Sequence, residues 1–135
     1  MIWHIRIDGK RRYVGGQALK NDVLDSIWDG WVWMLDDDCT AHPLLYRRAF
    51  HQREVARALI VSQQREDDSI LHAAASEVEV GKIDIGQAIL ARDLIGDHRI
   101  PETYAGDGMF LEAVLAETDA IIYLDEVLSH HNNIA

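Results

Sequence analysis

Residues 44–65 constrain the fold most, because this stretch contains neither glycine nor proline over its whole length. Ala, Leu, Arg, Gln and Glu make up most of it, and these residues have high intrinsic helix propensity. Pro43 precedes the stretch and suits a first helical position. The pattern therefore predicts one long helix over residues 44–65.

The chain before this stretch contains signals for strands and for a shorter helix. Apolar and polar residues alternate over residues 3–7, which is the period of a half-buried strand, and a return strand is expected over residues 11–14 after a glycine turn. Apolar residues spaced four apart predict a helix over residues 17–28. An apolar run then predicts a strand over residues 31–35, expected to be central because both of its faces are apolar.

The chain after residue 65 favours helices. Residues 70–80 suit either a helix or one strand of a hairpin, and helix is favoured because the hairpin would place Glu79 opposite Asp84. Asp84 also begins a relaxed capping box that predicts a helix over residues 85–95. A final helix is expected over residues 109–131.

The expected fold class is α+β: a small N-terminal β-β-α-β unit followed by a mainly helical remainder of about four helices. A length of 135 residues and 48% hydrophobic residues predict a single globular domain over residues 1–135. Cys39 is the only cysteine, so no intramolecular disulfide forms, as is common in reducing compartments. The sequence shows no signal peptide and no apolar run of membrane-spanning length. These features predict a cytoplasmic protein with no membrane contact.

Charge is the main clue to function. The net charge is −10 and the isoelectric point is about 5.0, which argues against a general nucleic-acid binder because phosphate attracts basic proteins. Acidic patches favour a basic protein surface as partner. The expected last helix carries three of the acids as one stripe. The candidate partner-binding residues are Asp36, Asp37, Asp38, Glu66, Asp67, Asp68, Glu112, Asp119 and Glu126.

Two arginines on the expected long helix have an unusual setting. Arg53 and Arg57 share a stripe with Tyr46 and lie between apolar side chains, where an unpaired charge is costly. One interpretation is an anion-binding pocket at Tyr46, Arg53 and Arg57. The other, favoured because the chain is rich in carboxylates, pairs these arginines internally with Asp125 or Glu117 of the last helix.

Metal and catalytic motifs are weak. Cys39 with His42, His98 with Glu102, and Glu126 with His130 are nearby ligand pairs that complete no known ligand set. No metal or cofactor is therefore predicted. The sequence contains no nucleophile elbow and no phosphate-binding loop, so no catalytic residue is assigned.

The four tryptophans, all in the first third, are expected to pack in the core.

The favoured function is a small acidic protein that acts by protein–protein interaction, as an inhibitor, immunity protein or adaptor. The alternative is a small ligand-binding domain or enzyme with the anion pocket. Whether the protein is an enzyme, and its oligomeric state, stay open.

Overall fold

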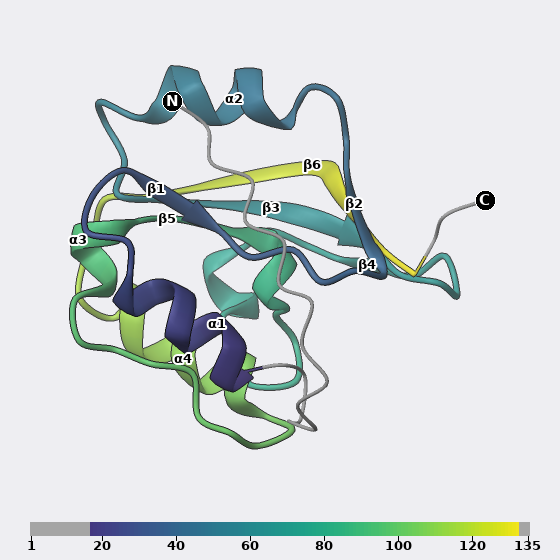
Figure 1. The fold of residues 1–135 in the computed structure, drawn as a ribbon. Helices are drawn as coiled ribbons and strands as arrows, with labels where there is room; N and C mark the ends of the chain where they lie inside the picture. The colour runs from purple at the N-terminus through teal and green to yellow at the C-terminus, as the bar shows by residue number, and fades with distance from the viewer. Residues whose placement is uncertain (1–16, 133–135) are drawn as a thin grey trace.

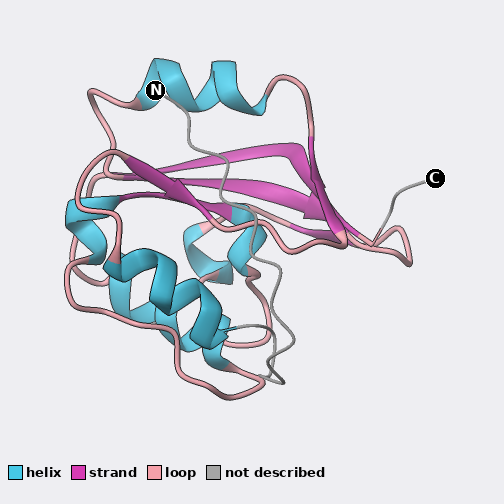
Figure 2. Ribbon diagram, viewed as in Figure 1, coloured by secondary structure: helices cyan, strands magenta, loops and turns pink. Residues whose placement is uncertain are grey.

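The computed structural model describes residues 17–132, which form a curled mixed sheet with helices on both faces (Figures 1 and 2). The strands are β1 (Trp31–Trp33), β2 (Cys39–Ala41), β3 (Ala58–Gln64), β4 (Ile70–Leu71), β5 (Ala88–Ala91) and β6 (Ile121–His131). The α-helices are α1 (Gln17–Asp25), α2 (Leu45–Gln52), α3 (Arg92–Ile95) and α4 (Gly106–Leu115), and two short 3-10 turns are η2 (Ala75–Glu77) and η3 (Ile85–Gln87).

Within residues 17–132 the sheet has six strands: five follow the order β1-β5-β3-β6-β2, and β4 pairs with the end of β3. The pair β3–β6 is parallel, with Ala58 opposite Ile121, and the other pairs are antiparallel. The register between β3 and β6 shifts twice, on either side of Ser62. β3 therefore lies at the centre, where it contacts three other strands.

Helices cover the two faces of the sheet unequally (Figure 1). On one face α1 and α4 pack Leu24 and Phe110 against the sheet side chains of the larger core, such as Ile60. On the other face α2 is the one helix that the described residues place there, and it contributes Leu45 to a smaller cluster around Val61. The larger core thus anchors the sheet, and α2 caps its second face.

The predicted long helix over residues 44–65 is wrong. α2 ends at Gln52, a turn follows, and residues 58–64 form β3. The Leu-Ile-Val run at residues 59–61 is almost fully buried between two neighbouring strands. A short buried apolar run has no periodicity that distinguishes strand from helix, so the absence of glycine and proline was misleading.

The predicted helices over residues 70–80, 85–95 and 109–131 are also wrong. Residues 70–80 contain β4 and η2 rather than a helix, and residues 85–95 contain η3, β5 and α3. The last helix ends at Leu115, and β6 follows. β6 begins Ile-Ile-Tyr-Leu, and β-branched and aromatic residues of this kind fit a sheet surface.

The N-terminal predictions have mixed outcomes. The strands expected over residues 3–7 and 11–14 lie outside the described residues. The helix at residues 17–28 and the strand at residues 31–35 are confirmed in shorter form as α1 and β1. Among the strands of residues 17–132, β1 lies at the edge of the sheet, which contradicts its expected central position. The protein mixes helices and sheet as an α+β chain does, but a β-β-α-β unit followed by a mainly helical remainder does not describe it. No helix within residues 17–132 has the length and apolar character that crossing a bilayer requires.

Candidate functional site

Two acidic segments that are far apart in the sequence meet where β6 ends. The backbone N–H of Asn132 donates to the carbonyl oxygen of Asp38 at 2.6 Å. The side-chain amide of the same residue donates to the carboxylate of Glu66. Residues 36–38 and residues 66–68, here called the acidic end, therefore flank one residue at the edge of the sheet. The sequence suggested both segments but gave no reason to place them together.

The turn that carries residues 66–68 is held by its own hydrogen bonds. The carboxylate of Asp67 accepts the backbone N–H of Ser69 at 3.0 Å and its hydroxyl at 2.5 Å. These two bonds lower the pKa of Asp67, so the turn keeps its charge. Asp68 adopts a φ of 66°, which closes the turn between β3 and β4. The acidic side chains are thus presented on a defined loop rather than on a free chain.

The acids of this end have unequal surroundings. Asp37, Glu66, Asp67 and Asp68 are exposed. Asp36 is half-buried, and its carboxylate lies 2.7 Å from the ammonium group of Lys20 on α1. The outward negative charge of the acidic end therefore comes mainly from the four exposed acids and from Asp38.

The other three candidate acids do not form the predicted stripe, because residues 121–131 are a strand. Glu112 lies on α4 and accepts the backbone N–H of Val80 at 3.0 Å. Glu126 lies on β6 and pairs with Arg48 of α2 at 3.2 Å. Asp119 lies in the loop between α4 and β6. The helical period that related these residues does not exist in the structure.

A buried polar network lies behind the acidic end, and sequence reasoning missed it. The amide of Gln63 is fully buried and donates to Asp84 at 3.0 Å and to the hydroxyl of Ser129 at 3.2 Å. The guanidinium of Arg65 donates to Gln63 and lies 3.6 Å from Asp84. These residues come from three separate parts of the chain, and only the Asp84 capping box, which is confirmed at η3, was visible in the sequence.

Asp107 is a further carboxylate that the sequence did not single out. Burial raises its pKa to about 6, against the attraction of Lys20 and with the help of the negative charges of Asp84 and Asp36. One of its carboxylate oxygens is buried and has no hydrogen-bond partner among residues 17–132. The group is therefore protonated more readily than an exposed aspartate.

Arg53 and Arg57 line one pocket with two tryptophans, at the end of β3 opposite the acidic end. Trp28 is 80% exposed and Trp31 is 38% exposed, so the prediction that the tryptophans pack in the core is wrong for both, and Trp3 lies outside the described residues. Trp33 is half-buried and packs beside the smaller cluster. We call the residues Trp28, Trp31, Arg53 and Arg57 the arginine–tryptophan pocket; Asp29, Gly30, Ala56, Ala91 and Asp93 complete its lining.

The two arginines contact neighbours within or beside this pocket. The guanidinium of Arg53 lies 3.7 Å from the centre of the Phe50 ring and 3.5 Å from the exposed carboxylate of Glu54. Arg57 lies 3.5 Å from Asp93, whose side chain is 76% exposed. Tyr46 does not line the pocket, since its ring packs beside Phe50 on α2.

The predicted pairing of these arginines with Asp125 or Glu117 is wrong. Asp125 accepts the hydroxyl of buried Ser62 at 2.6 Å and contacts His72 at 2.9 Å. Hydrogen bonds from Ser62 and His72 lower the pKa of Asp125. Because β6 is a strand, Asp125 lies beside β3 and β4 rather than beneath α2.

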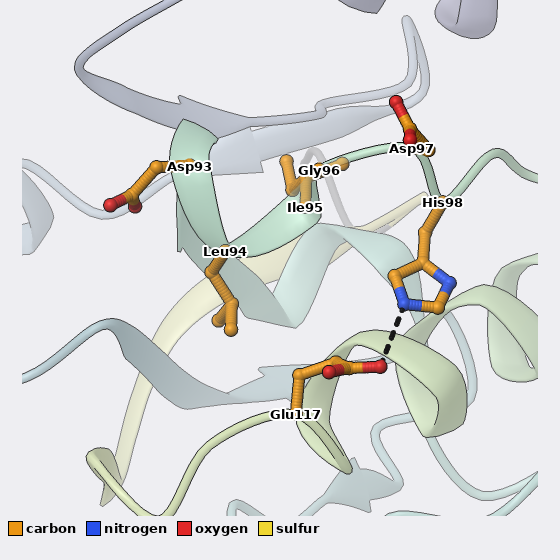
Figure 3. A pocket seen from close by; sticks show the side chains of 7 residues that line it. All are labelled: Asp93, Leu94, Ile95, Gly96, Asp97, His98 and Glu117. Carbon is orange, nitrogen blue, oxygen red and sulfur yellow. Dashed lines mark hydrogen bonds and ion pairs between the residues drawn. The ribbon is translucent and has the colours of Figure 1, made fainter.

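Glu117 lines a second hollow of about 430 Å³ beside α3 (Figure 3). His98 and Glu117 point toward each other there, with 3.3 Å between imidazole and carboxylate, whereas Asp93 points away from them. The ligand pair suggested by the sequence, His98 with Glu102, is replaced by this contact.

One group of side chains within residues 17–132 has the composition and spacing to hold a metal ion. It consists of Asp38, Cys39 and His131, each of which places one ligand atom within 4.8 Å of the others. Burial is the main cause that raises the pKa of the Cys39 thiol, and Asp38, Asp84 and Asp36 raise it further. His131 replaces the His42 that the sequence placed beside Cys39.

Comparison with known proteins assigns the chain to no family, because no protein-family model and no curated protein matches it. The functional argument therefore depends on the geometry of the chain itself.

Proposed function

We propose that the protein acts by binding a basic protein surface through its acidic end. The observation that carries the proposal is the meeting of residues 36–38 and residues 66–68 at Asn132. Two acidic loops held by backbone and side-chain bonds present a fixed field of negative charge, which favours fast association with a basic partner. A net charge of −10 adds long-range attraction of the same sign.

Two basic groups, Lys20 and Arg65, offset only part of the negative charge of the acidic end, which contains six acids. Lys20 reaches Asp36 from α1, and Arg65 is directed to Gln63 and Asp84. Asp37 and Glu66 are exposed and lie outside those contacts, whereas Arg65 also attracts the carboxylate of Asp67. An inhibitor, immunity protein or adaptor would use such a surface to match lysines and arginines of its partner.

The test compares two variants that remove the same charge from different faces. The patch variant is Asp37→Asn/Glu66→Gln/Asp68→Asn, in which asparagine suits the positive φ of Asp68. The control variant is Asp97→Asn/Glu102→Gln/Asp119→Asn, which changes three exposed acids outside the acidic end. Immobilised wild type and variants capture proteins from an extract, and captured basic proteins are then purified and titrated.

We expect the patch variant to lose at least tenfold in affinity for such a partner and the control variant to keep most of it. Binding should weaken steeply with added salt, because exposed charges are screened beyond about 8 Å at physiological ionic strength. Equal losses in both variants, or binding that is independent of salt, would contradict the proposal.

The arginine–tryptophan pocket favours a second candidate function, the binding of a small anionic ligand that carries an aromatic ring. Arg53 and Arg57 supply two guanidinium groups, and the exposed ring of Trp28 supplies a surface for stacking. Arginine forms hydrogen-bonded pairs with phosphate and carboxylate groups, often in a two-point geometry. The site would select ligands with both features.

This second candidate is tested by tryptophan fluorescence with phenyl phosphate as the probe and inorganic phosphate as the comparison. The dissociation constant for phenyl phosphate, measured from the quenching, should rise at least tenfold in Arg53→Gln/Arg57→Gln. It should persist in Arg47→Gln, which changes an exposed arginine of α2 outside the pocket. Quenching that is unchanged in the double variant would exclude the pocket.

A further inference from the structure

The end of β2 brings together three side chains with metal-ligand chemistry. Cys39 of β2 is directly opposite His131 of β6 in an antiparallel pair. Directly opposed residues of antiparallel strands present their side chains to the same face, about 5 Å apart at Cβ. Asp38 precedes β2, and its two carboxylate oxygens contact both neighbours. One oxygen lies 3.4 Å from the Cys39 sulfur, and the other lies 3.4 Å from the Nε2 atom of His131.

The imidazole of His131 supplies a second observation. Its Nδ1 atom is buried and has no hydrogen-bond partner among residues 17–132. A buried ring nitrogen normally has a partner, because leaving a polar atom unsatisfied costs about 1–3 kcal/mol. Nε2 faces Asp38, and within residues 17–132 no hydrogen bond to Nδ1 fixes the ring, so Nε2 can bind an ion that lies beside Asp38 and Cys39.

The three ligand types narrow the choice of ion. Thiolate, imidazole and carboxylate together are ligands of zinc and of its analogue cobalt, whereas magnesium and calcium prefer oxygen ligands alone. Bonds of about 2.0–2.3 Å in a tetrahedral site put ligand atoms roughly 3.3–3.8 Å apart. Each of the two contacts of Asp38 has this spacing, through a different carboxylate oxygen, and one ligand atom from each of the three residues lies within 4.8 Å of the others.

The electrostatic surroundings also suit a cation. Asp36 and Asp84 also lie near Cys39, but each has a basic neighbour, Lys20 and Arg65 respectively. The carboxylate of Asp38, which faces Cys39 and His131, supplies the negative charge that a divalent ion would balance. Three protein ligands would leave one position for water or another small ligand, as in zinc sites that are open to solvent.

We propose that Asp38, Cys39 and His131 form a binding site for a zinc-type divalent cation. The site does not depend on the proposed partner binding, because the exposed acids changed in that test, Asp37, Glu66 and Asp68, are not ligands here. The sequence could not reveal it, since His131 lies far from Cys39 along the chain and was assigned to a helix.

The test titrates the full chain, purified without a histidine tag and freed of metal, with cobalt(II). We expect saturation at one equivalent, a thiolate-to-cobalt charge-transfer band in the near ultraviolet, and displacement of cobalt by zinc. The melting temperature should rise with added zinc, because an ion that binds only the folded state stabilises it.

Two ligand variants and one matched control decide the outcome. Cys39→Ala should abolish the charge-transfer band, and His131→Asn should weaken cobalt binding at least tenfold. His130→Asn changes the adjacent residue of β6, whose side chain points to the opposite face, and should bind like wild type. Circular dichroism of each metal-free variant checks that it folds.

No charge-transfer band in the folded wild type would overturn the proposal. An equal loss in His130→Asn and His131→Asn would overturn it too. If Cys39→Ala does not fold, His131→Asn and its control still decide the question.

Discussion

At the scale of single residues, the least expected feature is the set of polar groups buried close to the acidic end. Gln63 and Ser129 are fully buried and satisfy each other, whereas Asp107 retains a buried oxygen without a partner. A satisfied buried network costs little, but an unsatisfied carboxylate lowers stability whenever it is ionised. Asp107 is therefore the residue at which a substitution should reveal the electrostatics of this region.

We predict that Asp107→Asn stabilises the protein at neutral pH more than in acid. The pKa of Asp107 is about 6 in the folded protein and 3.8 in an unfolded chain. Ionisation therefore favours the unfolded state, and wild type loses stability as the pH rises through this interval. Lowering the pH from about 8 to about 4 should shrink the advantage of the variant by about 1 kcal/mol, after discounting for solvent screening.

Urea unfolding of both proteins at the two pH values measures this difference. Asp97→Asn, which changes an exposed acid near α3, serves as the control and should show little pH-dependent change relative to wild type. A constant difference between Asp107→Asn and wild type at both pH values would show that burial does not raise the pKa of Asp107.

At the scale of elements, α4 depends on glycine at its first turn. A Cβ atom on Gly106 would lie 2.0 Å from the carbonyl oxygen of Pro101, and one on Gly108 would lie 2.8 Å from the Cα atom of Val80. Both neighbours are backbone atoms, which cannot move without displacing a loop. Glycine here permits close approach of chain segments, and the sequence alone suggested only a turn.

We predict that Gly106→Ala lowers the free energy of unfolding by about 3 kcal/mol or more, because the new methyl group overlaps backbone. Gly81→Ala is the matched comparison: Gly81 has a φ of 88° and nothing within 4 Å of the added atom. Its cost should be about 1–2 kcal/mol from backbone strain alone. Denaturant unfolding of the two variants checks the order, and an equal loss in both would contradict the role of close packing.

Elements with local signals were predictable, and those fixed by burial were not. α1 has apolar residues at helical spacing, and the capping box at Asp84 has its two side chains within one turn, so both were found. β3 and β6 contain residues with good helix propensity next to β-branched runs. Pairing between the two strands decided their conformation, and the paired residues, such as Ala58 and Ile121, lie more than 60 positions apart in the sequence.

At the scale of the whole molecule, the acids of residues 36–38 and 66–68 gather at one end of the sheet, whereas two arginines and two aspartates line the pocket at the other end. The acidic end lies where β2, β4 and β6 meet, and the arginine–tryptophan pocket lies at the opposite end of β3. This division places the two candidate sites far enough apart to act independently. It also concentrates repulsion among like charges at one place, which affects stability.

We predict that salt stabilises wild type more than the variant Asp37→Asn/Glu66→Gln/Asp68→Asn. Salt screens repulsion among exposed acids, and the variant has fewer of them at the acidic end. The difference should be a few tenths of a kcal/mol to about 1 kcal/mol between low and high ionic strength. Urea unfolding at two sodium chloride concentrations measures it.

The control variant Asp97→Asn/Glu102→Gln/Asp119→Asn removes the same number of charges from other positions. Its salt response should stay closer to that of wild type. If the two variants respond alike, net charge rather than the arrangement of the acidic end governs the effect.

The sequence by itself determined the overall acidity, the first helix, the short strand after it, and the acidic segments that now define one end of the molecule. Only the tertiary structure decided that residues 58–64 and 121–131 are strands, that the two acidic segments meet at Asn132, and that Cys39 faces His131. The reason is physical. Helix caps and amphipathic spacing act within one turn, whereas strand pairing joins distant residues, and no local pattern records which partner a buried apolar run will find.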